Sequence, residues 1–311
     1  MKRKDAGIIT GLALLFVLAL FYQRFTRKRE FTTVGTRGIS LRPIVVGRWR
    51  YIASAFCLAF SGLWIVLPVL MLIAGSFMRL YGFFSINAPF TLKHWMSTFS
   101  DPLLMICLKN SLIIALGVGV IGLAVYATIA YVLVRTTIPA RPAISILAWL
   151  PWAVPGILLG VALLWLLLSL PGMSIFYGTF VPLILVLVIK EMPIGTHMMK
   201  TALGQISKEL EEASWVCGAS RFTTFRRISL PLITPTLVSI FAIVLIAALR
   251  DISTTILLVT ANTRPLAVLM MEYSRGGQLE VASIIGVLIT TVAILMAMVA
   301  RRVGLRMSME V

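Results

Sequence analysis

The sequence contains few charged residues, few cysteines and few histidines. Charged side chains make up 13% of its 311 residues, and it has three cysteines and two histidines. Cys57, Cys107 and Cys217 form no Cys-x-x-Cys pair, so neither a disulfide framework nor a zinc site is indicated. His94 and His197 lie far apart, without a neighbouring set of ligands. We therefore expect no metal site in this chain and no cofactor bound by it.

Motifs for catalysis are also missing. No Gly-Lys dipeptide occurs, which excludes the phosphate-binding P-loop of many ATPases. Neither paired carboxylates nor a Ser-His-Asp set stands in a pattern that predicts a pocket. The chain is therefore predicted to have no catalytic residues and not to be an enzyme.

Long hydrophobic runs are abundant. Hydrophobic residues make up 59% of the chain, and its mean hydropathy is +1.00. Runs of about 20 residues recur, the length that crosses roughly 30 Å of hydrocarbon as a helix. Strands of a barrel would alternate in polarity, and these runs do not. We predict an all-α, polytopic transmembrane helical bundle.

Seven runs are predicted to span the membrane. No small-x-small cleavage site follows the first, and the basic cluster at residues 23–29 is typical of a retained helix. Residues 1–23 are thus predicted to be an extra N-terminal transmembrane helix, and residues 24–50 a basic cytoplasmic linker. The predicted spans are Ile8–Tyr22, Tyr51–Phe77, Asn110–Val134, Ala143–Leu168, Ile175–Ile189, Leu232–Thr260 and Ala282–Ala300.

The net charge is strongly positive, at +17, with 28 Lys and Arg against 11 Asp and Glu. Such a charge attracts nucleic acid, but the bases lie at the ends of apolar runs and form no basic face. A membrane protein beside anionic lipid, with its bases mainly on the cytoplasmic side, explains the charge better. We therefore expect membrane lipid and no nucleic acid around the chain. The same rule predicts an inner (plasma) membrane protein with an outer N-terminus and a cytoplasmic C-terminus.

The longest predicted cytoplasmic segment, residues 190–231, has the composition of a folded element. A helix is expected after Ser207 and an end at Gly218, because glycine tolerates the left-handed conformation that closes a helix. A second short helix is expected through Phe225, before Pro231 opens the next span. This arrangement suits a socket on another protein, although a helix lying on the membrane surface has the same periodicity. The apolar positions expected on one helical face are Leu203, Ile206, Leu210 and Ala213.

This segment resembles the EAA signature of binding-protein-dependent ABC importer permeases. The signature reads Glu-Ala-Ala, three residues, Gly, nine residues and Ile-x-Leu-Pro, and the spacing here is the same throughout. The one departure is Ser214 for the second alanine, which still permits close packing. The matching residues are Glu212, Ala213, Ser214, Gly218, Ile228, Leu230 and Pro231.

In that family the signature forms coupling helices that dock into a groove on a separate ATPase subunit, which binds the ATP. The resemblance implies the type I ABC importer permease fold, with six core helices in residues 51–311. It implies three partners: the ATPase, a periplasmic or extracellular substrate-binding protein, and a second permease subunit in a homo- or heterodimer. Glu212 would meet the ATPase electrostatically, and Gly218 would set the angle between the helices. Close packing or anchoring to the core is implied for Ala213, Ser214, Ile228, Leu230 and Pro231.

The N-terminal region resembles the linker of fused ferric-iron permeases, in which two six-span halves share one chain. The similarity lies in residues 31–50 and in the order of spans over residues 8–302. It implies the last helix of a first half, the linker and a complete second half, as in a split or truncated form. Ferric iron is the implied substrate. Phosphonate, polyamine, sulfate and thiamine are the alternatives within the family.

Charged residues interrupt the sixth predicted span at Arg250 and Asp251, shortly before Ser253. Ions inside a membrane are costly and normally face a cavity or a partner. We therefore predict a translocation path at these three residues. The stretch Asp251-Ile252-Ser253 is similar to a Glu-x-Ser pattern of iron-type relatives. A local ion pair between neighbouring helices is the alternative. Charges lie deep only in this predicted span, which disfavours a stand-alone secondary transporter, the second function considered.

Overall fold

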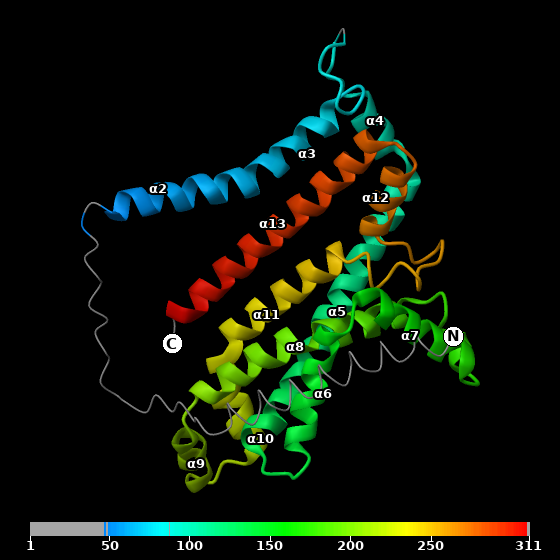
Figure 1. The fold of residues 1–311 in the computed structure, drawn as a ribbon. Coiled ribbons are helices and arrows are strands. Elements are labelled where there is room, and N and C mark those ends of the chain that lie inside the picture. The colour runs from blue at the N-terminus through cyan, green and yellow to red at the C-terminus, as the bar shows by residue number, and fades with distance from the viewer. Residues whose placement is uncertain (1–46, 48, 87, 310–311) are drawn as a thin grey trace, which may run out of the picture. The chain divides into compact units, whose positions relative to one another are not determined.

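The computed structural model describes residue 47 and residues 49–86 and 88–309. The predicted helix at residues 1–23 and nearly all of the linker lie outside the described residues. The described part is helical and holds no strand beyond an isolated bridge between Met78 and Phe90, so the all-α prediction is confirmed. Its elements (Figure 1) are α2 Trp49–Ser61, η1 Gly62–Val66, α3 Leu67–Phe77, α4 Lys93–Ser100, α5 Pro102–Arg135, α6 Arg141–Ala153, α7 Gly156–Ser169, η2 Met173–Phe176, α8 Phe180–Gln205, α9 Lys208–Val216, α10 Arg221–Thr224, η3 Phe225–Ser229, α11 Leu230–Arg250, α12 Leu266–Arg275 and α13 Leu279–Met309.

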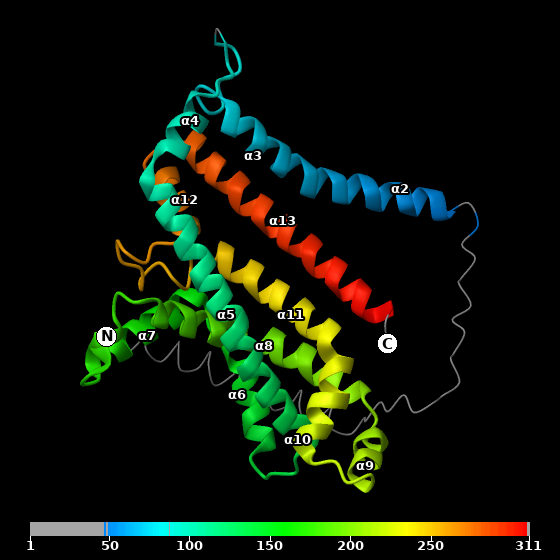
Figure 2. The ribbon, with the colours of Figure 1, turned by 180° about the vertical axis from the view of Figure 1, so that it is seen from behind.

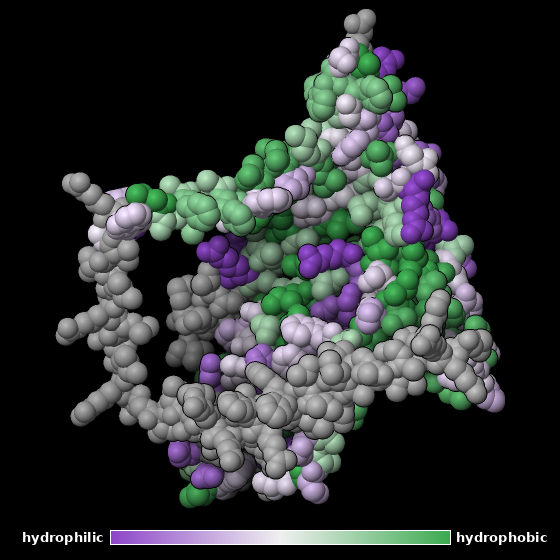
Figure 3. All heavy atoms as spheres, viewed as in Figure 1, coloured by the Kyte–Doolittle hydropathy of each residue, from purple (hydrophilic) through white to green (hydrophobic). Residues whose placement is uncertain are grey.

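Several of these helices are long and apolar enough to cross a membrane. The pair α6 and α7, bent by 110° at its break, provides one further span if the two helices count together. Each predicted span after residue 50 therefore has a helix or a helix pair. Figure 3 shows wide hydrophobic areas on one face, interrupted by smaller hydrophilic groups. The five uninterrupted spans of the described residues are Trp49–Phe77, Pro102–Arg135, Phe180–Gln205, Phe225–Arg250 and Leu279–Arg302.

The chain divides into two units between Leu67 and Pro68. In the first unit, α2 is apolar and none of its residues is buried. It continues into the π-helical turn η1. The second unit, from Pro68 onward, contains the helical bundle described below.

The core of the second unit lies where α5 packs against α8 and α11 (Figures 1 and 2). Tyr126 of α5 is fully buried, and its hydroxyl donates to the carbonyl of Val188 in α8 at 2.8 Å. Gly195 of α8 leaves space for the ring, because a Cβ there would lie 2.1 Å from it. A buried tyrosine hydroxyl needs such a partner. The contact therefore holds α5 and α8 at a close and defined separation.

The ends of two spans differ from the prediction. The predicted span Ile175–Ile189 is α8, which begins at Phe180 and continues to Gln205. It continues because its later turns bury side chains, such as that of Met199, inside the bundle and not in lipid. The predicted span Leu232–Thr260 is helical only to Arg250. Its apolar composition extends further, but the backbone leaves the helix at the charged residues.

The predicted span Ala143–Leu168 is a broken pair of helices. Pro155 stands between α6 and α7, and proline both lacks an N–H and keeps the preceding residue out of the helical region. Gly160 on α7 lies against the segment that follows α11: a Cβ there would be 2.5 Å from the backbone oxygen of Thr254. The break therefore lets α7 approach a non-helical backbone closely.

Replacing Gly160 by alanine is expected to lower the free energy of unfolding by about 1–3 kcal/mol, the usual cost of overpacking. The new methyl meets a backbone carbonyl, which cannot rotate away as a side chain would. Gly204→Ala is the matched control, because Gly204 is exposed within α8 and has no atom within 4 Å of a built Cβ. It is expected to be neutral or stabilising by up to about 1 kcal/mol. Thermal unfolding of the two variants in detergent measures the difference, and equal midpoints would contradict the close approach.

Candidate functional site

A segment of short helices joins α8 to α11 at one end of the bundle, opposite the end that holds α4 and α12 (Figures 1 and 2). We call residues 206–229, which include α9, α10 and η3, the elbow. As predicted, α9 begins after Ser207 and ends before Gly218, whose φ of +84° is left-handed. The amides of Gly218 and Ala219 donate to the carbonyls of Trp215 and Ser214 at 2.9 and 3.1 Å. Glycine thus suits the left-handed turn that reverses the chain here.

The signature residues occupy different environments in the elbow. Glu212 and Ala213 are exposed, as is Gly218. Ser214 is half-buried, and its hydroxyl bonds to that of Thr224 at 2.9 Å, which links α9 to α10. Glu212, Ala213 and Gly218 therefore lie on the surface of the elbow, whereas Ser214 makes a contact inside it.

The end of the signature leads into the membrane helix. Leu230 packs against the main hydrophobic core, and Ile228 is half-buried. Pro231 is exposed in the first turn of α11, where a proline needs no amide partner. The buried residue of this stretch is Ser229.

The predicted bounds of this loop, residues 190–231, are wrong at the N-terminal side. Lys190 to Gln205 belong to α8, a helix long and apolar enough to cross a membrane, so the connecting segment begins only after Gln205. The predicted common face of Leu203, Ile206, Leu210 and Ala213 is also wrong. The helix is interrupted at Ile206, which is buried, whereas Leu210 beyond it is 49% exposed. The apolar spacing continues across a break that periodicity alone does not reveal.

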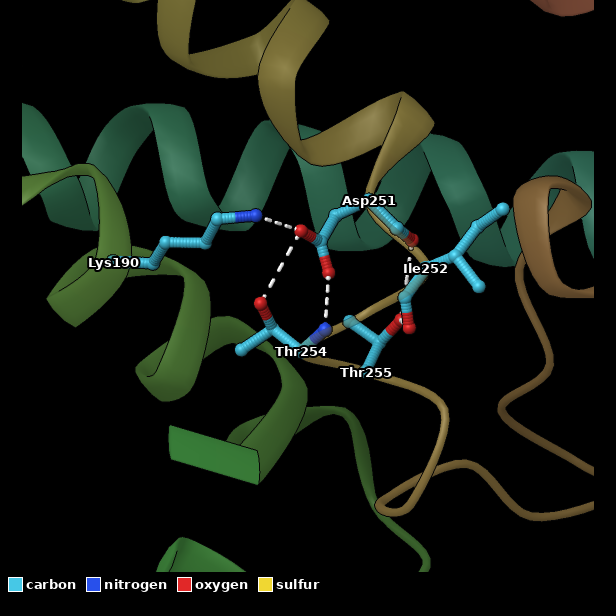
Figure 4. Close-up of polar contacts among 5 residues, drawn as sticks. All are labelled: Lys190, Asp251, Ile252, Thr254 and Thr255. Carbon is cyan, nitrogen blue, oxygen red and sulfur yellow. Dashed lines mark hydrogen bonds and ion pairs between the residues drawn. The ribbon is translucent and has the colours of Figure 1, made fainter. Parts of the chain in front are cut away.

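Asp251 organises the backbone directly after α11 (Figure 4). Its carboxylate accepts from the amide of Thr254 at 3.0 Å and from the hydroxyl of Thr254 at 3.2 Å. It also forms an ion pair with Lys190 of α8. The side chain of Asp251 is 2% exposed and that of Lys190 is 31% exposed. Asp251 thus stabilises a turn and a helix contact at the same time, as the local ion-pair alternative requires.

A cavity of about 660 Å³ adjoins this turn, midway along α8. Arg250 and Ser253 line it and are exposed, whereas Glu191 lines it from a recessed, largely buried position. Lys190 and Asp251 complete its charged wall, and Trp152 and Pro151 of α6 contribute apolar surface. The three predicted path residues therefore come together at one cavity. Lys190 and Glu191 were missed, because they follow the predicted end of a span in sequence.

The chain between α11 and α12 is non-helical although it lies beside these spans. Backbone groups at membrane depth must be paired within the protein. Asn110 of α5 donates to the carbonyls of Asn262 and Arg264 at 2.9 and 3.1 Å. Ser111 accepts from the amide of Leu266 at 2.7 Å. Polar side chains of α5 thus replace the hydrogen bonds that a continuous helix would have made.

Metal-ligating side chains do not gather at this cavity or elsewhere in residues 47, 49–86 and 88–309. No group of three or more His, Cys, Asp or Glu in these ranges is arranged to hold an ion. The candidate site thus consists of an exposed elbow and a polar cavity beside α8 and α11.

A family comparison agrees with this combination of elbow and cavity. The chain belongs to the family of binding-protein-dependent transport system inner membrane components, which matches residues 121–305. The matched region contains both the elbow and all the charged residues of the cavity. The chain is therefore a multi-pass component of an inner membrane.

Relatives of stated function are transport permeases. A Haemophilus influenzae protein whose name assigns it to a ferric transport system, permease FbpB 1, is 30% identical over 269 residues, covering 84% of this chain and 41% of that protein. The ferric transport system permease protein FbpB of Actinobacillus pleuropneumoniae is 30% identical over 164 residues, or 53% of this chain and 24% of that protein. The molybdate/tungstate transport system permease protein WtpB of Thermococcus kodakarensis is 25% identical over 197 residues, or 63% and 77%. The chain spans less than half the length of these two ferric-transport relatives.

Solved ABC transporters share the fold. A chain of a bacterial transporter involved in the import of the polysaccharide alginate superposes with a TM-score of 0.67 at 18% identity, covering 83% of this chain and 96% of that chain. A chain of the inward-facing MetNI methionine transporter gives 0.53 at 22% identity, covering 69% and 98%. The predicted importer-permease fold is thereby confirmed.

Proposed function

We propose that this chain is a permease subunit of an ATP-driven, binding-protein-dependent importer, and that its elbow docks on a separate ATPase subunit. The observation that carries the proposal is that two helices connect the elbow to the cavity. Helix α8 ends at the elbow and α11 begins there, and both contribute charged residues to the cavity. A movement imposed on the elbow therefore reaches the cavity through two continuous helices.

The lengths of these connections support a mechanical role. At about 1.5 Å per residue, the helix from Lys190 to Gln205 extends roughly 22 Å, and that from Leu230 to Arg250 roughly 30 Å. Both helices pack against α5. Helices braced in this way move as rigid elements, which suits the switch between inward- and outward-facing states.

The exposed charge at the cavity supports a second permease subunit. Arg250 and Ser253 are exposed on this chain at the level of Lys190, midway along a span. Arg250 is the last residue of α11 but shares the cavity with Lys190 of α8, and an arginine facing lipid at the centre of the bilayer costs about 2.5–3.5 kcal/mol or more. We therefore infer that a second permease, identical or different, covers this face and that the path for the substrate runs between the two. A substrate-binding protein would deliver the substrate from the outer side.

Orientation follows from the docking role. The ATPase and its ATP are cytoplasmic, so the elbow is on that side in the proposal. After the elbow, α11 leads away and α13 returns, which makes the C-terminus cytoplasmic. The proposed substrate is ferric iron, the cargo that the names of two relatives indicate. Sulfate, phosphonate, polyamine and thiamine remain alternative cargoes, and molybdate or tungstate joins them through a third relative.

Cysteine cross-linking to the co-expressed ATPase subunit tests the docking role. In a chain whose native cysteines are replaced by serine, Val216→Cys is expected to cross-link, because Val216 is 88% exposed at the end of α9. Met96→Cys is the matched control, since Met96 is 72% exposed on the short helix α4 at the opposite end. Cross-linking from residue 216 and not from residue 96 is the expected result. A product from residue 96, or none from either residue, would refute the proposal.

A further inference from the structure

A buried ion pair connects the elbow to the bundle. Arg135, the last residue of α5, contacts Glu211 of α9 at 3.1 Å, and the two side chains are 7% and 10% exposed. Arg135 also donates through Nε to the same carboxylate oxygen and through Nη2 to the carbonyl of Ile206, both at 3.1 Å. The hydroxyl of Ser229 donates to that oxygen at 3.1 Å. The end of α5, α9 and η3 therefore meet at one carboxylate, and the Arg135 guanidinium also holds the end of α8.

Glu211 is buried, unlike the neighbouring glutamates of α9. Glu209 and Glu212 are exposed, whereas Glu211 points into the bundle. The EAA signature contains Glu212 and not Glu211, so the resemblance assigns Glu211 no role. The carboxylate is not part of the exposed surface that meets another protein. Its contacts act within the chain.

Other features of α9 lie at its ends and within the elbow. The chain enters α9 through Ser207, which makes no side-chain cap bond, and leaves it at Gly218. The Ser214–Thr224 hydroxyl contact joins α9 only to α10, inside the elbow. Among the described side chains, the pair with Arg135 is an ion pair that ties α9 directly to a membrane helix.

We propose that Arg135 and Glu211 form a clamp that transmits movement of α9 to α5, which makes both positioning residues for the coupling of ATP hydrolysis to transport. The inference rests on the proposed function. It adds a third connection to those through α8 and α11. Helix α5 packs against both of these helices. Its residues Asn110 and Ser111 hold the segment between α11 and α12 that begins at the cavity.

The chemistry suits a rigid connection. A buried carboxylate that accepts from a guanidinium and a hydroxyl is oriented by each donor, and the low dielectric strengthens these bonds. Glu211→Gln keeps the shape of the side chain but removes its charge. Arg135→Lys keeps the charge but loses the planar donor group that contacts both Glu211 and Ile206. Either change loosens the clamp while leaving the exposed face of α9 unaltered.

The test separates docking from transmission in the complete complex with its ATPase. Docking is measured by the Val216→Cys cross-link. Transmission is measured by the maleimide labelling rate of Ile243→Cys, a 41% exposed residue that lines the cavity from α11, with and without ATP and vanadate. Glu211→Gln and Arg135→Lys are expected to retain the cross-link but to lose the ATP-dependent change in labelling. Glu209→Gln, an exposed glutamate of α9 outside the signature, is expected to retain that change.

The outcomes distinguish the clamp from the proposed function. If the parent chain shows neither cross-link nor ATP-dependent labelling, the proposed function itself fails. If both are present and Glu211→Gln and Arg135→Lys keep the full labelling change, the clamp is refuted. Loss of the cross-link in these variants also refutes it, because the pair would then act on docking. Thermal midpoints of the variants identify any that does not fold, and the remaining variant then decides.

Discussion

Gly218→Asp is expected to abolish docking on the ATPase, and with it import, while the chain still inserts into the membrane. Gly218 is exposed, and no atom lies within 4 Å of a built Cβ, so the chain itself has room for a side chain. Aspartate is also among the residues that tolerate a left-handed conformation such as this φ of +84°. The loss arises at the docked surface, where the new carboxylate would have to leave water without a partner. The Val216→Cys cross-link should therefore fall to background, with normal recovery from the membrane fraction.

Asparagine at the same position is the matched control. It has nearly the size of aspartate and the same tolerance of the left-handed region, but it carries no charge. Gly218→Asn should retain most of the cross-link. Valine, which is β-branched and strained at positive φ, should instead disturb the turn and lower stability. If the Gly218→Asp variant forms the Val216→Cys cross-link as well as the parent chain does, Gly218 does not lie at the docking surface.

Lys190→Met is expected to destabilise the bundle far more than Asp251→Asn does. Without Lys190, Asp251 keeps a charge at a site that is 2% exposed, and breaking a buried pair from one side costs about 3–5 kcal/mol. Without the Asp251 charge, Lys190 remains 31% exposed toward a cavity where water can solvate it. Asparagine still accepts from the amide of Thr254. The double variant should therefore be more stable than Lys190→Met alone.

Thermal unfolding in detergent measures this order directly. Equal losses from the two single variants would show that the buried carboxylate is not the sensitive partner. Import by Asp251→Asn tests the path separately, because a residue that borders the path should change uptake kinetics even when the fold tolerates its substitution. Unchanged kinetics would leave Asp251 with the structural role that its contacts with Lys190 and Thr254 describe.

Much of this architecture is predictable from the sequence because membranes impose simple rules. Apolar runs of sufficient length must become helices, since lipid offers the backbone no hydrogen-bond partner. Every predicted span after residue 50 accordingly coincides with a helix or a helix pair. The turn at Gly218 was predictable for a similarly local reason, because a glycine after an amphipathic segment favours a left-handed cap.

The ends of the helices were less predictable, because composition and backbone conformation diverge there. The run from Ile252 to Thr260 is largely apolar, yet Asp251 and the side chains of α5 support a non-helical path. Conversely, α8 continues past Lys190 because its later turns are buried against neighbouring helices. Hydropathy measures the transfer of side chains into lipid and is insensitive to such packing.

By itself the sequence determined the class of protein, the apolar spans after residue 50 and the signature residues of the elbow. These depend on local composition and on residues near one another in the chain. Only the tertiary structure paired Lys190 with Asp251 and Arg135 with Glu211, across separations of 61 and 76 residues. A buried charge is costly unless an opposite charge lies beside it, so these pairs depend on which side chains the packed helices bring together in space. That proximity exists only once the bundle has formed.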